Sequence, residues 1–188
     1  MDAPEQPLTG EGAQRAPDSP RAERDAQRQA DLGVLRERVA RAFTGRKVLE
    51  LGCGVGEWTQ AYAGRAAQVT ALDASEELLT LARAARFMPG RVEFVRGDYA
   101  ALPDFGRRHD ALFVPYRWSR VPPERLDAFL LRAVDAVAPG ALVAFLDERG
   151  AKGAPSASDL IRRASRCGWG ANVELLPSFW LLTWWAGR

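Results

Sequence analysis

The chain has 188 residues, a formal net charge of +2 and 47% hydrophobic residues, which fits one globular domain with a sizeable core. Its cysteines are two isolated residues, Cys53 and Cys167, and His109 is its single histidine. This content excludes a disulfide framework, a His-rich metal centre and a Ser-His-Asp triad. The arginines are spread along the chain without interleaved aromatics, so we expect no nucleic-acid partner. The sequence has no leader and no long apolar stretch, which predicts a cytoplasmic protein without membrane contact.

The beginning of the chain differs in composition from the rest. Residues 1–22 are rich in Pro, Gly, Ala and charge, with Leu8 as the large apolar residue. Because such a segment cannot offset its ordering entropy by burial, we expect a disordered tail there and a single domain over 23–188. From about residue 23 to 43, apolar side chains recur at three- and four-residue steps, which predicts a helix that ends at Gly45.

The remainder of the chain alternates short apolar runs with helical patterns. We expect strands over 47–52, 68–73, 91–98, 109–116, 141–148, 173–177 and 179–186, and helices over 57–65, 75–87, 123–138 and 158–168. Only Pro177-Ser178 joins the last two strands, too few residues for a crossover helix, so they should form an antiparallel hairpin. The sequence therefore predicts an α/β, doubly wound, mostly parallel sheet of seven strands with one reversed edge strand.

A glycine-rich loop follows the first predicted strand. Glycines stand at positions 52, 54 and 56, with Glu50 before them. Glycines let the backbone turn sharply and approach a ligand closely, and the next helix presents unpaired N–H groups. The spacing G-x-G-x-G differs from the G-x-G-x-x-G of dinucleotide loops, which argues against a nicotinamide-dependent oxidoreductase. A turn that binds nothing is the alternative, but the strand–loop–helix context favours a binding loop.

Two acids end the next strands. Asp73 lies about twenty residues beyond the loop, the usual place of an acid that binds ribose hydroxyls. It could instead cap the following helix together with Glu76. Asp98, in Gly97-Asp98-Tyr99, ends the third strand and could bind a base or simply form a turn. Three successive strand ends with suitable residues favour a nucleoside-binding site.

Residues 30–186 resemble the class I S-adenosylmethionine-dependent methyltransferases, which are Rossmann-like, and among them a bacterial small-molecule branch. The motifs that carry the resemblance are GRKVLELGCGVGEWTQ, VTALDASEELLTLAR, VEFVRGDY, DALFVPYRWSRVP, APGALVAFLDER and FWLLTWW. The resemblance implies S-adenosyl-L-methionine as cofactor, no metal, and methyl transfer to a small-molecule acceptor, mainly by positioning for in-line displacement. The alternative is a non-catalytic S-adenosylmethionine-binding regulatory or partner protein.

The resemblance also assigns the cofactor-binding residues. They are Glu50, Gly52, Cys53, Gly54, Gly56, Asp73, Ala74, Asp98, Tyr99 and Phe113. By this assignment Asp73 would bind the ribose, and Asp98 with Tyr99 the adenine. Glu50 would orient the loop or face the methionine ammonium, and Phe113 would lie beside the transferring methyl.

The segment after the fourth strand departs from the family pattern. Similar sequences often read aromatic-Trp-Ser-His-Val-Pro there, whereas this chain has Arg117 and Arg120 in place of the aromatic residue and the histidine. Together with Tyr116, which could act as a general base, they are the candidates for the catalytic residues. The two arginines could bind an anionic acceptor through forked hydrogen bonds, or they could belong to a solvated loop. Asp147 and Glu148 could act as a base, but a solvated strand end is the expected interpretation.

Three residues outside the loops receive structural interpretations. His109 lies at the start of the fourth strand, the wrong end for catalysis, so we expect a structural or surface role. Trp184 and Trp185 are consecutive and must face opposite sides of their strand. At least one of them should therefore be exposed or lie at an interface, which makes a homodimer through this edge possible.

Overall fold

A computed structural model describes residues 19–87, 90–98, 101–106, 108–116, 121–150, 156–166 and 170–185 of the chain. The strands are β1 (Lys47–Leu51), β2 (Gln68–Asp73), β3 (Val92–Arg96), β4 (Ala111–Pro115), β5 (Leu142–Glu148), β6 (Ala171–Leu175) and β7 (Phe179–Trp185). The helices are α1 (Pro20–Ala42), α2 (Glu57–Tyr62), α3 (Glu76–Ala84), α4 (Leu126–Asp135) and α5 (Ala157–Arg166), with a 3-10 turn at Pro123–Arg125. The predicted elements are therefore all present, most of them shortened at one or both ends.

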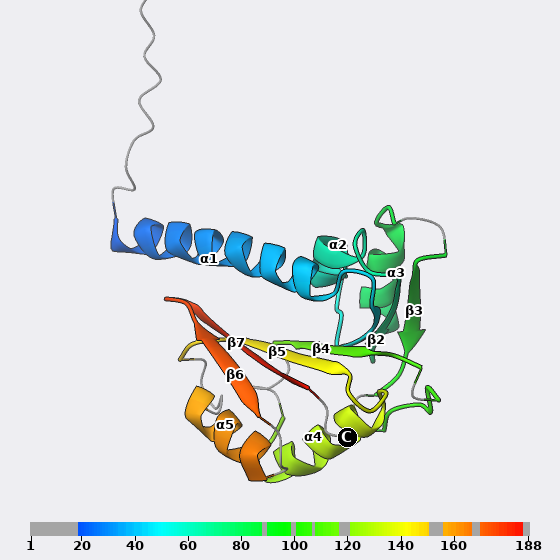
Figure 1. Cartoon of the computed structure of the whole chain (residues 1–188). Coiled ribbons are helices and arrows are strands. Elements are labelled where there is room, and N and C mark those ends of the chain that lie inside the picture. The colour runs from blue at the N-terminus through cyan, green and yellow to red at the C-terminus, as the bar shows by residue number, and fades with distance from the viewer. Residues whose placement is uncertain are drawn as a thin grey trace, which may run out of the picture.

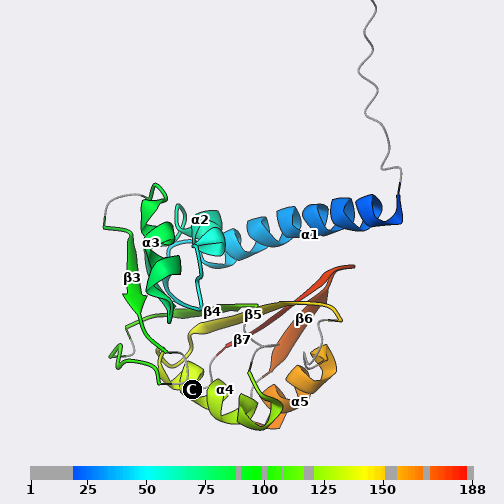
Figure 2. The same ribbon diagram turned by 180° about the vertical axis from the view of Figure 1, so that it is seen from behind.

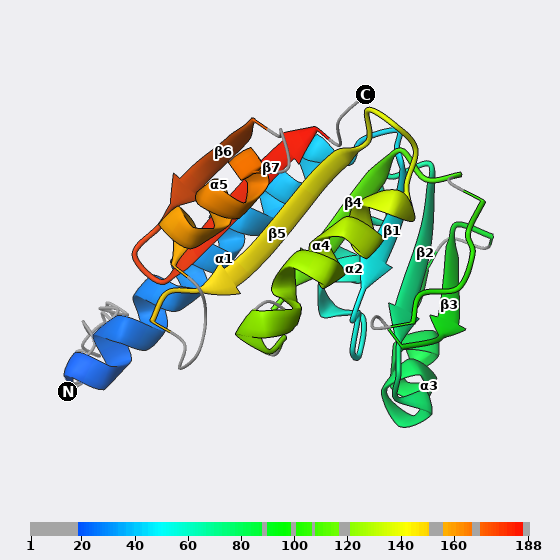
Figure 3. The ribbon, with the colours of Figure 1, turned by 90° about the horizontal axis from the view of Figure 1, so that it is seen from below.

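One seven-stranded sheet organises the chain, in the order β3-β2-β1-β4-β5-β7-β6. Strands β1 to β5 pair in parallel, and β7 is antiparallel to both β5 and β6. The doubly wound sheet and the C-terminal hairpin are confirmed. The prediction that the reversed strand forms the edge is wrong, because β7 lies between β5 and β6 (Figure 3). Residues 179–182 are all buried and need neighbours on both sides, whereas the half-exposed β6, with Glu174, suits the edge.

Helices cover both faces of the sheet (Figures 1 and 2). Helices α1, α2 and α3 lie on one face, and α4 and α5 lie on the other. Each face has its own apolar cluster, and the side chains of β4 alternate between them. Ala111 and Phe113 belong to the cluster under α1 and α2, and Leu112 and Val114 to the cluster over α4. Burial on both faces explains why the sequence of β4 is apolar throughout.

Helix α1 begins earlier than predicted. Ser19 caps it by accepting a hydrogen bond from the amide of Ala22 (3.2 Å), and Pro20 occupies the first turn. The predicted tail boundary at residue 22 is thus wrong for residues 20–22, while residues 1–18 lie outside the described part. The helix runs alongside the C-terminal hairpin (Figure 3), where the buried Asp31 accepts a hydrogen bond from the Ser178 amide (2.8 Å).

The amino end of β4 holds His109, whose burial fits the predicted structural role. The side chain is 2% exposed and its Nε2 lies 2.9 Å from the hydroxyl of Thr70. Burial, assisted by the nearby positive charge of Arg108, lowers the pKa of His109 to about 4.

Trp185, the last residue of β7, is 56% exposed, as one of the two consecutive tryptophans was expected to be. Among the described helices, none combines the length and apolarity needed to cross a membrane.

Candidate functional site

The glycine loop lies where β1 ends, next to the end of β2. Gly52, Gly54 and Gly56 have φ angles of 77°, 57° and 79°, in the left-handed region that side chains disfavour. The Gly52 and Cys53 amides both donate to the Leu72 carbonyl, at 2.6 and 3.0 Å, which fixes the loop to β2. A Cβ placed on Gly54 would have no heavy atom within 4 Å, so the loop borders open space at this residue.

Asp73 holds the loop from the end of β2. Its carboxylate is 4% exposed and accepts hydrogen bonds from the Gly54 amide (2.9 Å) and the Ser75 amide (3.0 Å). The N-cap of α3 is Ser75, whose hydroxyl accepts from Leu78, so the alternative role of Asp73 as the cap is wrong. Because a carboxylate offers about four acceptor positions, Asp73 can bind the loop and still accept ribose hydroxyls.

Asp98 lies beyond the end of β3 and is exposed, as is Ala74 after β2. Gly97 brings this segment against β2, because its amide donates to the Asp73 carbonyl (3.0 Å). A side chain at Gly97 would require Leu72 to move, because a Cβ would lie 2.9 Å from Cδ1 of Leu72. The sequence pattern indicated no role for this glycine, although it helps to fix the position of the acid that follows it.

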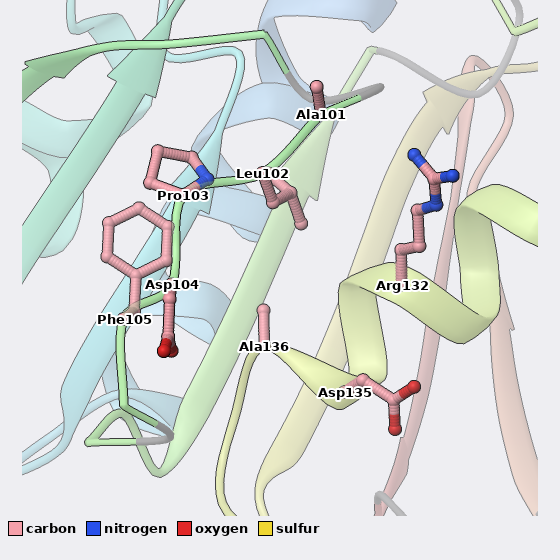
Figure 4. A pocket seen from close by; sticks show the side chains of 8 residues that line it. All are labelled: Ala101, Leu102, Pro103, Asp104, Phe105, Arg132, Asp135 and Ala136. Carbon is pink, nitrogen blue, oxygen red and sulfur yellow. The ribbon is translucent and has the colours of Figure 1, made fainter.

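A hollow of about 470 Å³ opens beside Asp98, in the size range of small-molecule sites. Its other lining residues come from α4 and the segment before it: Val121, Pro122, Arg125, Ala128, Phe129 and Arg132. Figure 4 shows a neighbouring hollow of about 320 Å³, between the extended segment 101–105 and the end of α4. Arg132 borders both hollows, so α4 forms a common wall.

Glu50 lies under the loop with its side chain fully buried. Its Oε2 accepts hydrogen bonds from the hydroxyls of Thr59 and Tyr62, each at 2.7 Å, which attaches α2 to β1. Burial and the charge of Glu50 hold the pKa of Tyr62 well above its usual value, so its hydroxyl stays a donor. Two roles were suggested for Glu50, to orient the loop or to face the methionine ammonium. Its bonds to α2 fit the first of these roles. Cys53 is also buried.

Phe113 lies in the middle of β4 and not at the carboxyl ends of the strands, where the glycine loop lies. Its ring is fully buried and packs edge-to-face against Phe43, Trp58 and Tyr62, with centroids 5.4 to 5.8 Å apart. The residue directly after the carboxyl end of β4 is Tyr116, whose ring lies 6.1 Å from that of Trp58. The side chain of Phe113 therefore contributes to the core.

An ion pair lies at the carboxyl end of β5. Arg28 of α1 bonds Glu148 of β5 (Nε to Oε1, 3.1 Å), and its guanidinium lies 5.3 Å from the ring centroid of Phe179. The expectation of a solvated strand end holds for Glu148, but it is wrong for Asp147, which is 2% exposed and accepts from the Glu148 amide. Sequence reasoning missed Arg28 because nothing local connects it with a strand 120 residues away.

Three predicted site residues, Tyr99, Arg117 and Arg120, fall outside the described residues. Apart from Phe113, which lies in the core, the others gather at two places along the carboxyl edge of the sheet. The glycine loop, Asp73 and Asp98 surround the ends of β1, β2 and β3, and Tyr116 lies at the end of β4. Within the described residues, no cluster of three or more His, Cys, Asp or Glu side chains could hold a metal ion.

This fold and this loop define a Rossmann-like methyltransferase domain that binds a nucleoside cofactor. Residues 48–140 match the family described as a methyltransferase domain. Two solved structures, described as the DhpI-SAH complex and the DhpI-SAM-HEP complex, are 31% and 30% identical to the chain. They cover 89% and 86% of this chain and 91% and 86% of their own, with TM-scores of 0.70 and 0.68. The chain belongs to the class I S-adenosylmethionine-dependent methyltransferases, and S-adenosylmethionine is the cofactor of this family.

A curated relative matches a shorter stretch. The "Ubiquinone biosynthesis O-methyltransferase" of Bordetella pertussis is 38% identical over 72 residues, which is 38% of this chain and 28% of the relative. The match thus spans little more than a quarter of that protein. The described site fits the family cofactor, because open space borders the left-handed Gly54 and two carboxylates end the neighbouring strands.

Proposed function

We propose that this chain transfers the methyl group of S-adenosylmethionine to an oxygen atom of a small molecule. The observation that carries the proposal is the loop at residues 52–56, which Asp73 holds through Gly54 with open space beside it. An oxygen acceptor is supported by the matching relative, which is an O-methyltransferase by name. The proposed reaction needs no metal ion, because the cofactor itself supplies the electrophilic methyl group.

Each residue of the site has a proposed part in binding. The backbone at Gly52, Cys53, Gly54 and Gly56 would run under the methionine moiety, with Glu50 orienting the loop from below. Asp73 would accept hydrogen bonds from the ribose, while Ala74, Asp98 and Tyr99 would surround the adenine. When bound, the cofactor supplies an electrophilic methyl group. The protein then needs to align acceptor and cofactor, a contribution that reaches about 7–11 kcal/mol in well-aligned systems.

We further propose that the methyl acceptor is an anion. Arg117 and Arg120 follow β4 within five residues of its end, and carboxyl ends of parallel strands are where ligands of such sheets bind. Replacing both arginines with alanine should raise the KM of an anionic acceptor and leave the affinity for S-adenosylmethionine unchanged. An equal loss of both affinities would count against the anionic acceptor.

The proposed activity can be tested with cofactors and a matched acceptor series. Calorimetry should show binding of S-adenosylmethionine and S-adenosylhomocysteine but not of NAD. Release of S-adenosylhomocysteine should then follow with catechol, benzoate or phenyl phosphate, and not with benzylamine, which shares the ring but offers nitrogen. Absence of binding of either nucleoside would refute the function, and binding without turnover would favour a non-catalytic partner protein.

Two glycines provide a matched pair of variants for the loop. Gly54 and Gly64 both have open space where a Cβ would be, but only Gly54 of the two has a positive φ. Gly54→Ala should therefore lower the affinity for S-adenosylhomocysteine, whereas Gly64→Ala, in the turn after α2, should not. Equal affinities of the two variants would mean that the loop does not contact the cofactor.

We also propose a homodimer, now through β6, since β6 and not β7 is the edge strand. Leu175 of β6 and Trp185 of β7 are 60% and 56% exposed, which supports an interface near this edge. Size-exclusion chromatography with light scattering tests it, and a monomer at high concentration would contradict it.

A further inference from the structure

The backbone at Tyr116 is left-handed. Its φ angle is 52°, and among the described residues it is the single non-glycine with a positive φ. A bulky residue adopts this conformation only where its surroundings impose it, and such residues concentrate at functional sites. Here the Tyr116 amide donates to the carbonyl of Leu146 in β5 (2.8 Å), so the residue stays tied to the sheet while its backbone turns.

This turn decides which face of the sheet receives the side chain. Leu112 and Val114 face α4, and a strand that continued regularly would send the side chain of Tyr116 to that face too. Its ring instead joins the cluster on the α1 and α2 face, between the rings of Trp58 and Phe179, 6.1 and 6.2 Å away. The left-handed residue therefore moves a phenol from the α4 face to the α1 face.

The surroundings of the ring determine what the phenol can do. Burial raises the pKa of Tyr116 to about 12, against the opposing effect of the positive charge on Arg28. The hydroxyl is therefore protonated at neutral pH, which makes it a hydrogen-bond donor and not a general base. The charged groups that act on the hydroxyl are Arg28, Glu57 and Glu148, and Arg28 and Glu148 form a half-exposed ion pair.

We infer that Tyr116 is a specificity-determining residue, whose left-handed backbone places its hydroxyl to donate a hydrogen bond to an oxygen atom of the methyl acceptor. The inference rests on the proposed methyl transfer and deepens it, since it assigns the acceptor to the α1 face at the end of β4. The group recognised is an oxygen that accepts a hydrogen bond, such as a phenolate, carboxylate or phosphate oxygen.

The variant Tyr116→Phe tests the inference, because it retains the ring between Trp58 and Phe179 and removes only the hydroxyl. In the complex with S-adenosylhomocysteine, catechol and phenyl phosphate are titrated by calorimetry. We expect the variant to bind whichever probe the wild type binds about tenfold more weakly, the loss of one good hydrogen bond. The affinity for S-adenosylhomocysteine and the melting temperature should stay unchanged.

Tyr62→Phe serves as the comparison, since it removes the other described tyrosine hydroxyl, which is bonded to Glu50 and not to the acceptor side. It should change the stability and leave the affinity for the probe as it is. Equal probe binding by wild type and Tyr116→Phe would overturn the inference, and so would a wild type that binds neither probe. Failure of the wild type to bind S-adenosylhomocysteine would instead overturn the proposed function.

Discussion

Replacement of Asp73 by asparagine should damage both the fold and the cofactor site. The carboxylate is almost fully buried and accepts hydrogen bonds from the amides of Gly54 and Ser75. An asparagine can accept one of these bonds with its carbonyl, but its amide group would then face the other N–H. One charge-assisted bond is lost, which costs about 2 kcal/mol. For a domain of this size, that corresponds to a fall in melting temperature of about 4–8 °C.

The isosteric substitution Asp98→Asn is the matched control. Asp98 is exposed, so its replacement should leave the melting temperature within about 1–2 °C of the wild type. Both variants should lose affinity for S-adenosylhomocysteine, measured by calorimetry below the melting temperature of the weaker variant. Thermal unfolding thus separates the acid that supports the loop from the acid that we propose to contact the adenine.

If Asp73→Asn has the melting temperature of the wild type, the two backbone hydrogen bonds contribute nothing to stability, which contradicts the prediction. A second contradicting result is an Asp73→Asn variant that unfolds at a lower temperature but binds S-adenosylhomocysteine normally below it. In that case, the carboxylate would support the fold without supporting the site.

Three further predictions concern buried groups. The pKa of His109 is about 4 in the fold and near 6.5 when unfolded, so the neutral form stabilises the fold above pH 6.5. The free energy of unfolding, measured by denaturant titration, should therefore fall by up to about 3 kcal/mol as the pH drops from 6.5 to 4. In the variant His109→Gln, this pH dependence should be absent. Tyr62→Phe should cost about 1–3 kcal/mol, measured by urea unfolding, because a buried bond to Glu50 is lost. Gly97→Ala should lower the free energy of unfolding by about 1–3 kcal/mol, because the added methyl group overpacks against Leu72. In the double variant, Leu72→Val should restore part of this loss. If the losses of the two single variants simply add, the contact between residues 97 and 72 does not cause the effect.

The parts of the fold that follow from local rules were predictable. Strand β2 occupies residues 68–73 as expected, because an apolar run ends at an acid before a helix. The glycine loop was also predictable, since its three left-handed positions can hardly be anything but glycine. The helix expected from Pro123 begins instead as a 3-10 turn and becomes α-helical at Leu126. The sequence pattern does not distinguish these two kinds of turn.

Features that depend on distant pairing could not be read from local sequence. The position of β7 between β5 and β6 depends on seven residue pairs with β5, while the two-residue hairpin turn is compatible with either order. The burial of Asp147 follows from the same pairing. Tyr116 carries no glycine or asparagine signal for its left-handed backbone, so the direction of its side chain toward α1 could not be predicted from the sequence.

Two buried carboxylates support the glycine loop from different sides, and their effects should be coupled. Asp73 binds the loop itself at Gly54, and Glu50 binds Thr59 and Tyr62 of the helix that the loop leads into. If the loop and α2 loosen as one unit, the first substitution already releases most of what the second would release. The costs of Asp73→Asn and Glu50→Gln should then be less than additive in the double variant, by about 0.5–2 kcal/mol in urea unfolding. Additive costs would mean that each acid supports its own element independently.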